Sequence, residues 1–145
     1  MATSNSNFVV NLVLLLNRLS LGLYFLLAGV GKIQGGVQNF VNKGFKSMQP
    51  AWLPDVIATP YGYAIPFLEV VLGGILIIGL FTRIASSLIA IMIFSFTIAL
   101  AISKGTLEHG PGPFNANFIM ITLALLLAVT GAGKWSVDAV VRKKM

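Results

Sequence analysis

The stretch YAIPFLEVVLGGILIIGLF, residues 63–81, decides the fold, because only one of its nineteen residues, Glu69, is charged. At 1.5 Å per residue, a helix of this length rises about 28 Å, which is close to the roughly 30 Å hydrocarbon core of a bilayer. The stretch is therefore predicted to cross a membrane as a helix.

Three further apolar stretches extend this pattern on both sides, at residues 8–30, 84–103 and 114–131. We therefore expect an all-α, polytopic membrane protein, a four-transmembrane-helix bundle that forms one domain over residues 1–145 and has both termini on one side. A minimal turn, 81–83, joins the second and third spans, whereas a long connection, 31–62, joins the first two. A cleaved signal peptide is the minor alternative for the first span, which lacks a basic segment before it and a small-residue cleavage site after it.

The composition agrees with a membrane protein. Of the 145 residues, 57% are hydrophobic and 10% are charged, and the mean hydropathy is +0.90. In soluble proteins, by contrast, about a quarter of all residues are charged. Because cysteine is absent, the sequence excludes thiol–disulfide exchange, iron–sulfur clusters and Cys-ligated zinc. We expect no metal site and no intrinsic cofactor.

The charged residues indicate the partners and the orientation. The net charge of +6 is spread along the chain, which favours contact with anionic lipid headgroups over nucleic-acid binding. Five basic residues flank the spans on the terminal side and four on the other, so the positive-inside rule favours cytoplasmic termini in a bacterial-type inner membrane. Trp52, Tyr61 and Tyr63 are expected in the interfacial belt of aromatic residues.

Two charges lie inside the predicted spans, Arg18 in the first and Glu69 in the second. A charge at mid-membrane must face protein, water or an opposite charge. Glu69 shares a helical stripe with Gly62, Pro66 and Gly73, so it faces inward. We expect an Arg18–Glu69 ion pair in a cavity that opens toward the long connection; the alternative is that the pair only holds the helices in register.

Further polar residues fall on the same side of the membrane as Glu69. Together with the two buried charges, they form a candidate polar site that consists of Arg18, Lys32, Glu69, Glu108, His109, Asn115 and Asn117. The plainer interpretations are a solvated loop histidine at position 109 and, for Lys32, a side chain that reaches from the span end to the headgroups.

The order of these residues resembles the DoxX family of small four-helix membrane proteins. The similarity extends from Asn17 to Asp138 and rests on charged residues, His109 and a glycine-rich framework. The motif residues besides Arg18, Lys32, Glu69 and His109 are Gly22, Gly29, Gly73, Gly79, Arg83, Gly131, Gly133 and Asp138. The resemblance implies a four-helix bundle and a redox association, since relatives are described as membrane subunits of quinone-linked oxidoreductases.

Three functions follow from these observations. The first is an accessory subunit of a quinone-linked oxidoreductase system, in which the polar site contacts a quinone and a partner protein supplies the electrons, because this chain has no catalytic motif of its own. The second is a non-enzymatic scaffold or assembly factor. The third, a small-solute channel or carrier, is weaker because one four-helix unit leaves little room for a pore, although a homo-oligomer could line one.

Overall fold

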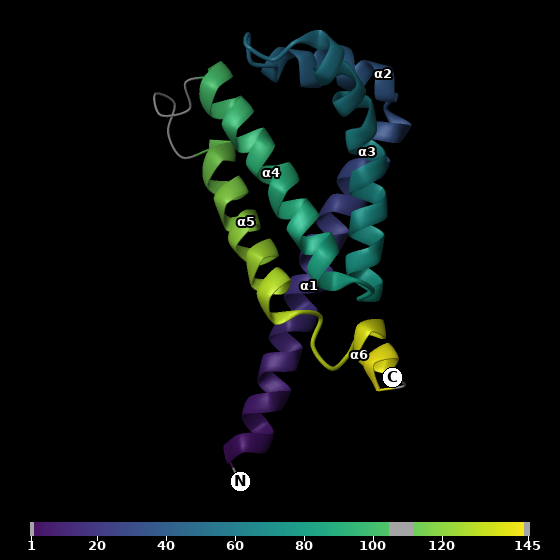
Figure 1. Ribbon diagram of the computed structural model, residues 1–145, viewed down its shortest axis with the longest axis vertical. Coiled ribbons are helices and arrows are strands. Elements are labelled where there is room, and N and C mark those ends of the chain that lie inside the picture. Colours follow the sequence, from purple (N-terminus) through teal and green to yellow (C-terminus); the bar gives the residue numbers. More distant parts are fainter. Residues whose placement is uncertain (1, 105–111, 144–145) are drawn as a thin grey trace.

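The computed structural model describes residues 2–104 and 112–143, with side-chain surroundings for 7–99, 116–141 and 143. Every regular element in this part of the chain is helical, which confirms the all-α prediction (Figure 1). In chain order the elements are α1 (Ala2–Gln34), α2 (Val37–Asn39), η1 (Phe40–Phe45), η2 (Lys46–Met48), α3 (Asp55–Ile78), α4 (Thr82–Lys104), α5 (Gly112–Thr130) and α6 (Val137–Arg142).

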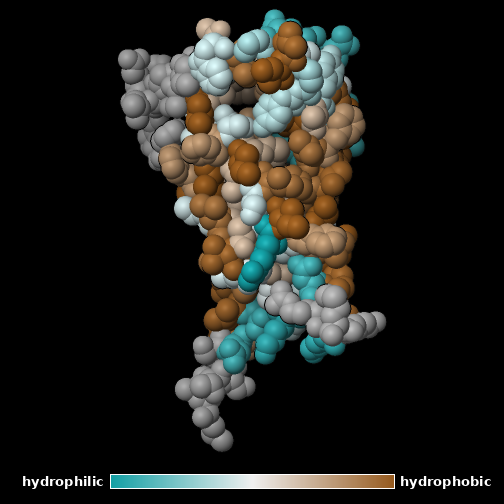
Figure 2. Space-filling model, in the orientation of Figure 1, coloured by the Kyte–Doolittle hydropathy of each residue, from teal (hydrophilic) through white to brown (hydrophobic). Residues whose placement is uncertain are grey.

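The long helices correspond to the predicted spans. Within the described residues, three helical segments are long and apolar enough to cross a membrane: Asn7–Gln34, Asp55–Ile78 and Thr82–Ala99. Ala116–Thr130 is a shorter apolar helix. Hydrophobic side chains cover most of the visible face between the two ends, and hydrophilic ones gather at the end where both termini lie (Figures 1 and 2).

The second span differs most from its predicted bounds. Helix α3 begins at Asp55, eight residues before the expected start, and runs through Pro60 and Pro66. Ala58 and Ile65 are fully buried in this region, with Phe45 beside them. Tertiary packing therefore extends the helix into a segment whose Pro and Gly content is typical of a loop. The preceding residues 37–53, here called the cap, fold over one end of the bundle.

The helices pack mainly as two pairs, α1 with α3 and α4 with α5. Glycines bring the first pair close: a Cβ on Gly73 would stand 2.7 Å from the carbonyl oxygen of Gly22, and one on Gly29 would stand 2.6 Å from that of Pro66. Small residues thus let the backbones of α1 and α3 approach closely, and we call this contact the α1–α3 seam. Helices α3 and α4 meet at the turn after Ile78 and diverge toward the cap (Figure 1).

Candidate functional site

Glu69 is the buried carboxylate of the bundle, and its partner is Lys32. The Lys32 ammonium donates hydrogen bonds to both carboxylate oxygens, at 2.6 Å to Oε2. The Glu69 side chain is 3% exposed and that of Lys32 is 25% exposed. The ammonium also lies 5.0 Å from the centre of the Phe40 ring, a cation–π arrangement. The Lys32 ammonium thus lies between the Glu69 carboxylate and the face of the Phe40 ring.

The expected Arg18–Glu69 pair is wrong. Side chains on a helix lean toward its N-terminus, and α1 and α3 run in opposite directions (Figure 1). Arg18 therefore leans toward the terminal end, while Glu69 leans toward the cap. Lys32, fourteen residues and about 21 Å farther along α1, leans back from the cap end and meets the carboxylate.

Arg18 instead holds the C-terminal segment. It is 2% exposed, and its guanidinium donates hydrogen bonds to the backbone oxygens of Ala132 at 3.0 Å and Trp135 at 2.8 Å. Among the buried polar atoms described, its Nε has no hydrogen-bond partner. Both terminal nitrogens of the intramembrane arginine thus bind backbone carbonyls of the C-terminal segment rather than a carboxylate.

Asp138 completes this contact from the opposite direction. Its carboxylate accepts hydrogen bonds from the backbone N–H groups of Phe81 and Thr82, at 2.8 and 2.9 Å, and its own N–H donates to the Gly79 oxygen at 2.9 Å. Gly79 ends α3 with a φ of 75°, a left-handed conformation that favours glycine. We call Arg18 together with residues 131–138, which include Asp138, the terminal clamp.

The remaining motif residues lie near this clamp. Gly131 adjoins the Arg83 side chain, and Gly133 adjoins Asn11, whose side-chain oxygen accepts from the Lys134 N–H at 2.7 Å. The glycines and charges of the DoxX-like pattern therefore divide between the α1–α3 seam and the terminal clamp.

A small pocket of about 120 Å³ surrounds the Lys32–Glu69 pair. It brings in Asn117 from α5, as expected for the candidate polar site. The remaining lining is largely apolar and aromatic and consists of Tyr24, Phe25, Ala28, Ile93, Phe96 and Met120. Glu108 and His109 lie outside the described residues, and so does the side chain of Asn115.

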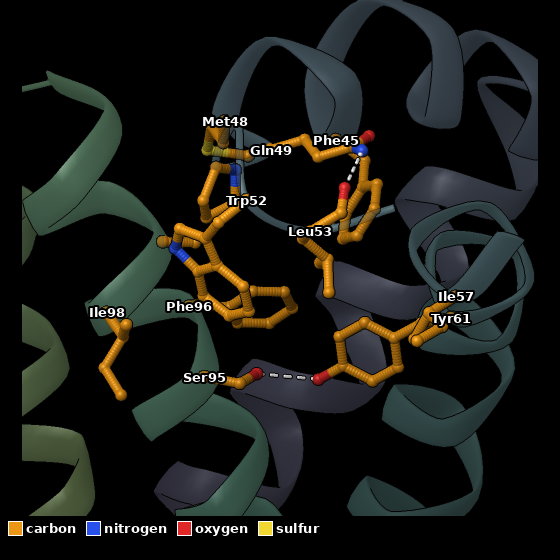
Figure 3. A pocket seen from close by; sticks show the side chains of 12 residues that line it. Phe45, Met48, Gln49, Trp52, Leu53, Ile57, Tyr61, Ser95, Phe96 and Ile98 are labelled. Atoms are coloured by element: carbon orange, nitrogen blue, oxygen red, sulfur yellow. Dashed lines mark hydrogen bonds between the residues drawn. The ribbon is translucent and has the colours of Figure 1, made fainter. Parts of the chain in front are cut away.

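A second, apolar cavity of about 280 Å³ lies beneath the cap, between α3 and α4 (Figure 3). Its polar feature is a hydrogen bond of 2.7 Å between the hydroxyls of Tyr61 and Ser95. Trp52 also lines it. Tyr61 and Trp52 were expected in the interfacial belt rather than at a binding site, and no sequence spacing relates either of them to Ser95. Phe96 borders both this cavity and the Lys32–Glu69 pocket.

The donor set fits hydrogen bonding and charge better than metal binding. Over the residues that the structure describes, no group of three or more His, Cys, Asp or Glu side chains could hold a metal ion. The Lys32–Glu69 pair with Asn117 can accept, donate or relay a proton to a small polar group. It has no nucleophile positioned by a base.

Comparison with known proteins gives one family. A family model described as Methylamine utilisation protein MauE matches residues 10–109. This range contains both Lys32 and Glu69. The matched family is a related small membrane family and not DoxX itself, so the expected resemblance is confirmed only at that coarser level. No curated protein and no solved structure matches the chain.

Proposed function

The chain belongs to the family of the methylamine utilisation protein MauE, and from this premise we propose that it is an accessory membrane protein of a system that oxidises methylamine. The match over residues 10–109 of 145 is the observation that carries this proposal. Its apolar helices, three of which are long enough among the described residues to cross a membrane, support this membrane role. The described part of the site, with Lys32, Glu69 and Asn117, offers hydrogen bonds and charge, and in this proposal a partner protein performs the oxidation.

The polar pocket supports a more specific role, in which the chain links its partner to the quinone pool. A quinone takes up two electrons and two protons, and here the partner enzyme supplies the electrons. Glu69 and Lys32 lie in a largely apolar pocket and can hold a proton near a carbonyl oxygen. Asn117 adds an amide that can donate or accept a hydrogen bond.

A scaffold or assembly factor is the second candidate, and the terminal clamp favours it. Arg18 uses its guanidinium on backbone carbonyls, and Asp138 uses its carboxylate on backbone N–H groups. Buried hydrogen bonds of this kind fix the C-terminal segment against the helices, and a rigid protein with a defined surface suits a scaffold. In that case the Lys32–Glu69 pair would serve only to set the register of α1 against α3.

Complementation in the native host tests the proposal. A deletion strain that carries the wild-type gene should grow on methylamine, and one that carries the empty vector should not, while both should grow on a substrate without an amine. Equal growth of both strains on methylamine would overturn the accessory role.

The pocket variants then separate the quinone link from the scaffold. Glu69→Gln keeps the shape of the side chain and removes its charge, so the quinone link predicts loss of methylamine-dependent quinone reduction in membranes that still contain the protein. Ser87→Ala, on α4 near the terminal end, is the matched control. Full activity of a stably folded Glu69→Gln variant would favour the scaffold.

A further inference from the structure

The cavity beneath the cap is a built feature of the fold. The Phe45 ring packs against Gly62, where a Cβ would stand 2.8 Å from the ring, and it meets the Tyr61 ring edge-on at 6.0 Å. Phe45 is the last residue of η1, which is a π-helical turn. Such turns occur often at functional sites. Gly62 therefore admits the ring that forms one wall of the cavity.

The lining is apolar except for a few placed polar groups, as in binding sites for small organic molecules. The Gln49 amide is already used, since it donates to the Leu53 oxygen at 2.8 Å and to Asp55 at 2.9 Å. Among the other lining side chains, Ser95 and Tyr61 carry hydroxyls and Trp52 carries an indole N–H, and all three are labelled in Figure 3.

The hydroxyls of Tyr61 and Ser95 can still bind an oxygen atom of a ligand, as their existing hydrogen bonds show. Ser95 donates its one proton to the Met92 oxygen at 2.7 Å, so the proton between the two hydroxyls belongs to Tyr61. A ligand hydroxyl can donate to the Tyr61 oxygen without breaking a bond. A ligand carbonyl can accept the Tyr61 proton after the hydroxyl rotates.

The mouth of the cavity lies among side chains on the apolar surface of the bundle. Trp52 is 63% exposed and Ile57 is 61% exposed, and Tyr61 lies six residues, or about 9 Å, from the start of α3. An entering molecule therefore comes from the lipid phase near the headgroups. Once inside, it is separated from the Lys32–Glu69 pocket by Phe96, which lines both spaces.

We propose that this cavity binds the ring of an uncharged, lipid-soluble ring compound that carries a carbonyl or hydroxyl oxygen, with the Tyr61 hydroxyl as its anchor. The volume of about 280 Å³ suits one substituted ring and leaves a long tail in the bilayer. That the compound is a quinone rests on the proposed function. The ring site itself rests on the cavity and its hydroxyl pair.

Trp52 reports binding directly, because the chain has two tryptophans and the other, Trp135, lies at the opposite end of the bundle. The Trp135→Phe variant, reconstituted in nanodiscs, is titrated with a benzoquinone that carries a decyl tail. Quenching of Trp52 should saturate at one site. In the Trp52→Phe control, quenching of Trp135 should rise with quinone concentration without saturating.

Substitutions in the Trp135→Phe background identify the anchor. Tyr61→Phe removes the hydroxyl that donates to the quinone carbonyl and should weaken binding by about three- to ten-fold. Ser95→Ala removes the acceptor that competes for the Tyr61 proton, so it should leave binding as strong as before or stronger. Ala99→Phe fills the cavity and should abolish saturation. Ser87→Ala and Tyr63→Phe change the same residue types outside the cavity and should leave binding unchanged.

Three results would overturn the ring site. They are quenching of Trp52 that never saturates, saturation that survives Ala99→Phe with unchanged affinity, and displacement of the quinone by decanol as effective as by a second quinone. Failure of the proposed function has a different signature, namely saturable Trp52 quenching in a protein whose gene is dispensable for growth on methylamine. Loss of growth without saturable quenching would remove the ring site and leave the accessory role.

Discussion

The ammonium of Lys32 bridges both carboxylate oxygens of Glu69, and it joins α1 to α3 near the end of the bundle that the cap covers. The pair is flanked by Phe40 on one side and by the pocket that contains Asn117 on the other. The pair holds two helices together, and in the proposed function it also presents a carboxylate to a ligand or partner group; experiments can separate these two roles.

Removing one member of the pair should destabilise the protein more than removing both. Lys32→Met leaves the Glu69 carboxylate buried without a cation, at a cost of about 3 to 5 kcal/mol. The Lys32→Met/Glu69→Leu double variant replaces both charges with apolar groups and should recover most of that loss. Thermal unfolding in detergent measures the effect, and Lys46→Met, on the exposed surface of the cap, is the control. Equal losses in the single and double variants would contradict a coupled pair.

The terminal clamp predicts that Asp138→Asn loosens the C-terminal segment. Phe81 and Thr82 donate to different oxygens of the carboxylate, and in asparagine one of these oxygens becomes an NH2 group that faces a backbone N–H. We therefore expect a loss of about 1 to 3 kcal/mol. Limited proteolysis should remove α6 faster in this variant. Asp55→Asn, at the exposed start of α3, should leave the cleavage rate near that of the wild type, and an unchanged rate in Asp138→Asn would contradict the clamp.

How far the sequence predicts this structure depends on the kind of contact. Hydropathy and length locate the long helices, and the motif glycines Gly22, Gly29 and Gly73 prove to lie at the α1–α3 seam. The burial of Glu69 follows from its stripe. Each of these features depends on how residues are spaced within one helix, so the 3.6-residue helical repeat is enough to predict it.

The partners of the two buried charges do not follow from sequence in the same way. Arg18 binds backbone carbonyls, which every residue possesses, so no side-chain pattern marks them. The choice of Lys32 for Glu69 depends on the lean of side chains along antiparallel helices. The cavity requires the cap to fold over α3 and α4, and nothing local in 31–62 predicts that fold.

Two neighbouring glycines offer a matched test of the α1–α3 seam. A Cβ on Gly73 would stand 2.6 Å from the Leu26 nitrogen, whereas one on Gly74 would meet nothing within 4 Å. Gly73→Ala should therefore lower stability by about 1 to 3 kcal/mol through overpacking. Gly74→Ala should be neutral or raise stability by up to about 1 kcal/mol, because alanine favours helix. Thermal unfolding of both variants decides the matter, and a loss confined to Gly74→Ala would contradict the observed seam.

The absence of cysteine allows a clean measurement of topology, because each introduced thiol is the only one in the chain. Both termini lie at one end of the bundle and the cap lies at the other (Figure 1). The excess of basic residues at the terminal end favours the cytoplasm. Val140→Cys should therefore react with a membrane-impermeant maleimide only after the membrane is opened. Lys46→Cys, exposed on the cap, should react in intact cells. Labelling of Val140→Cys but not of Lys46→Cys in intact cells would reverse the orientation, and labelling of both would show that the apolar helices do not separate the two ends across a membrane.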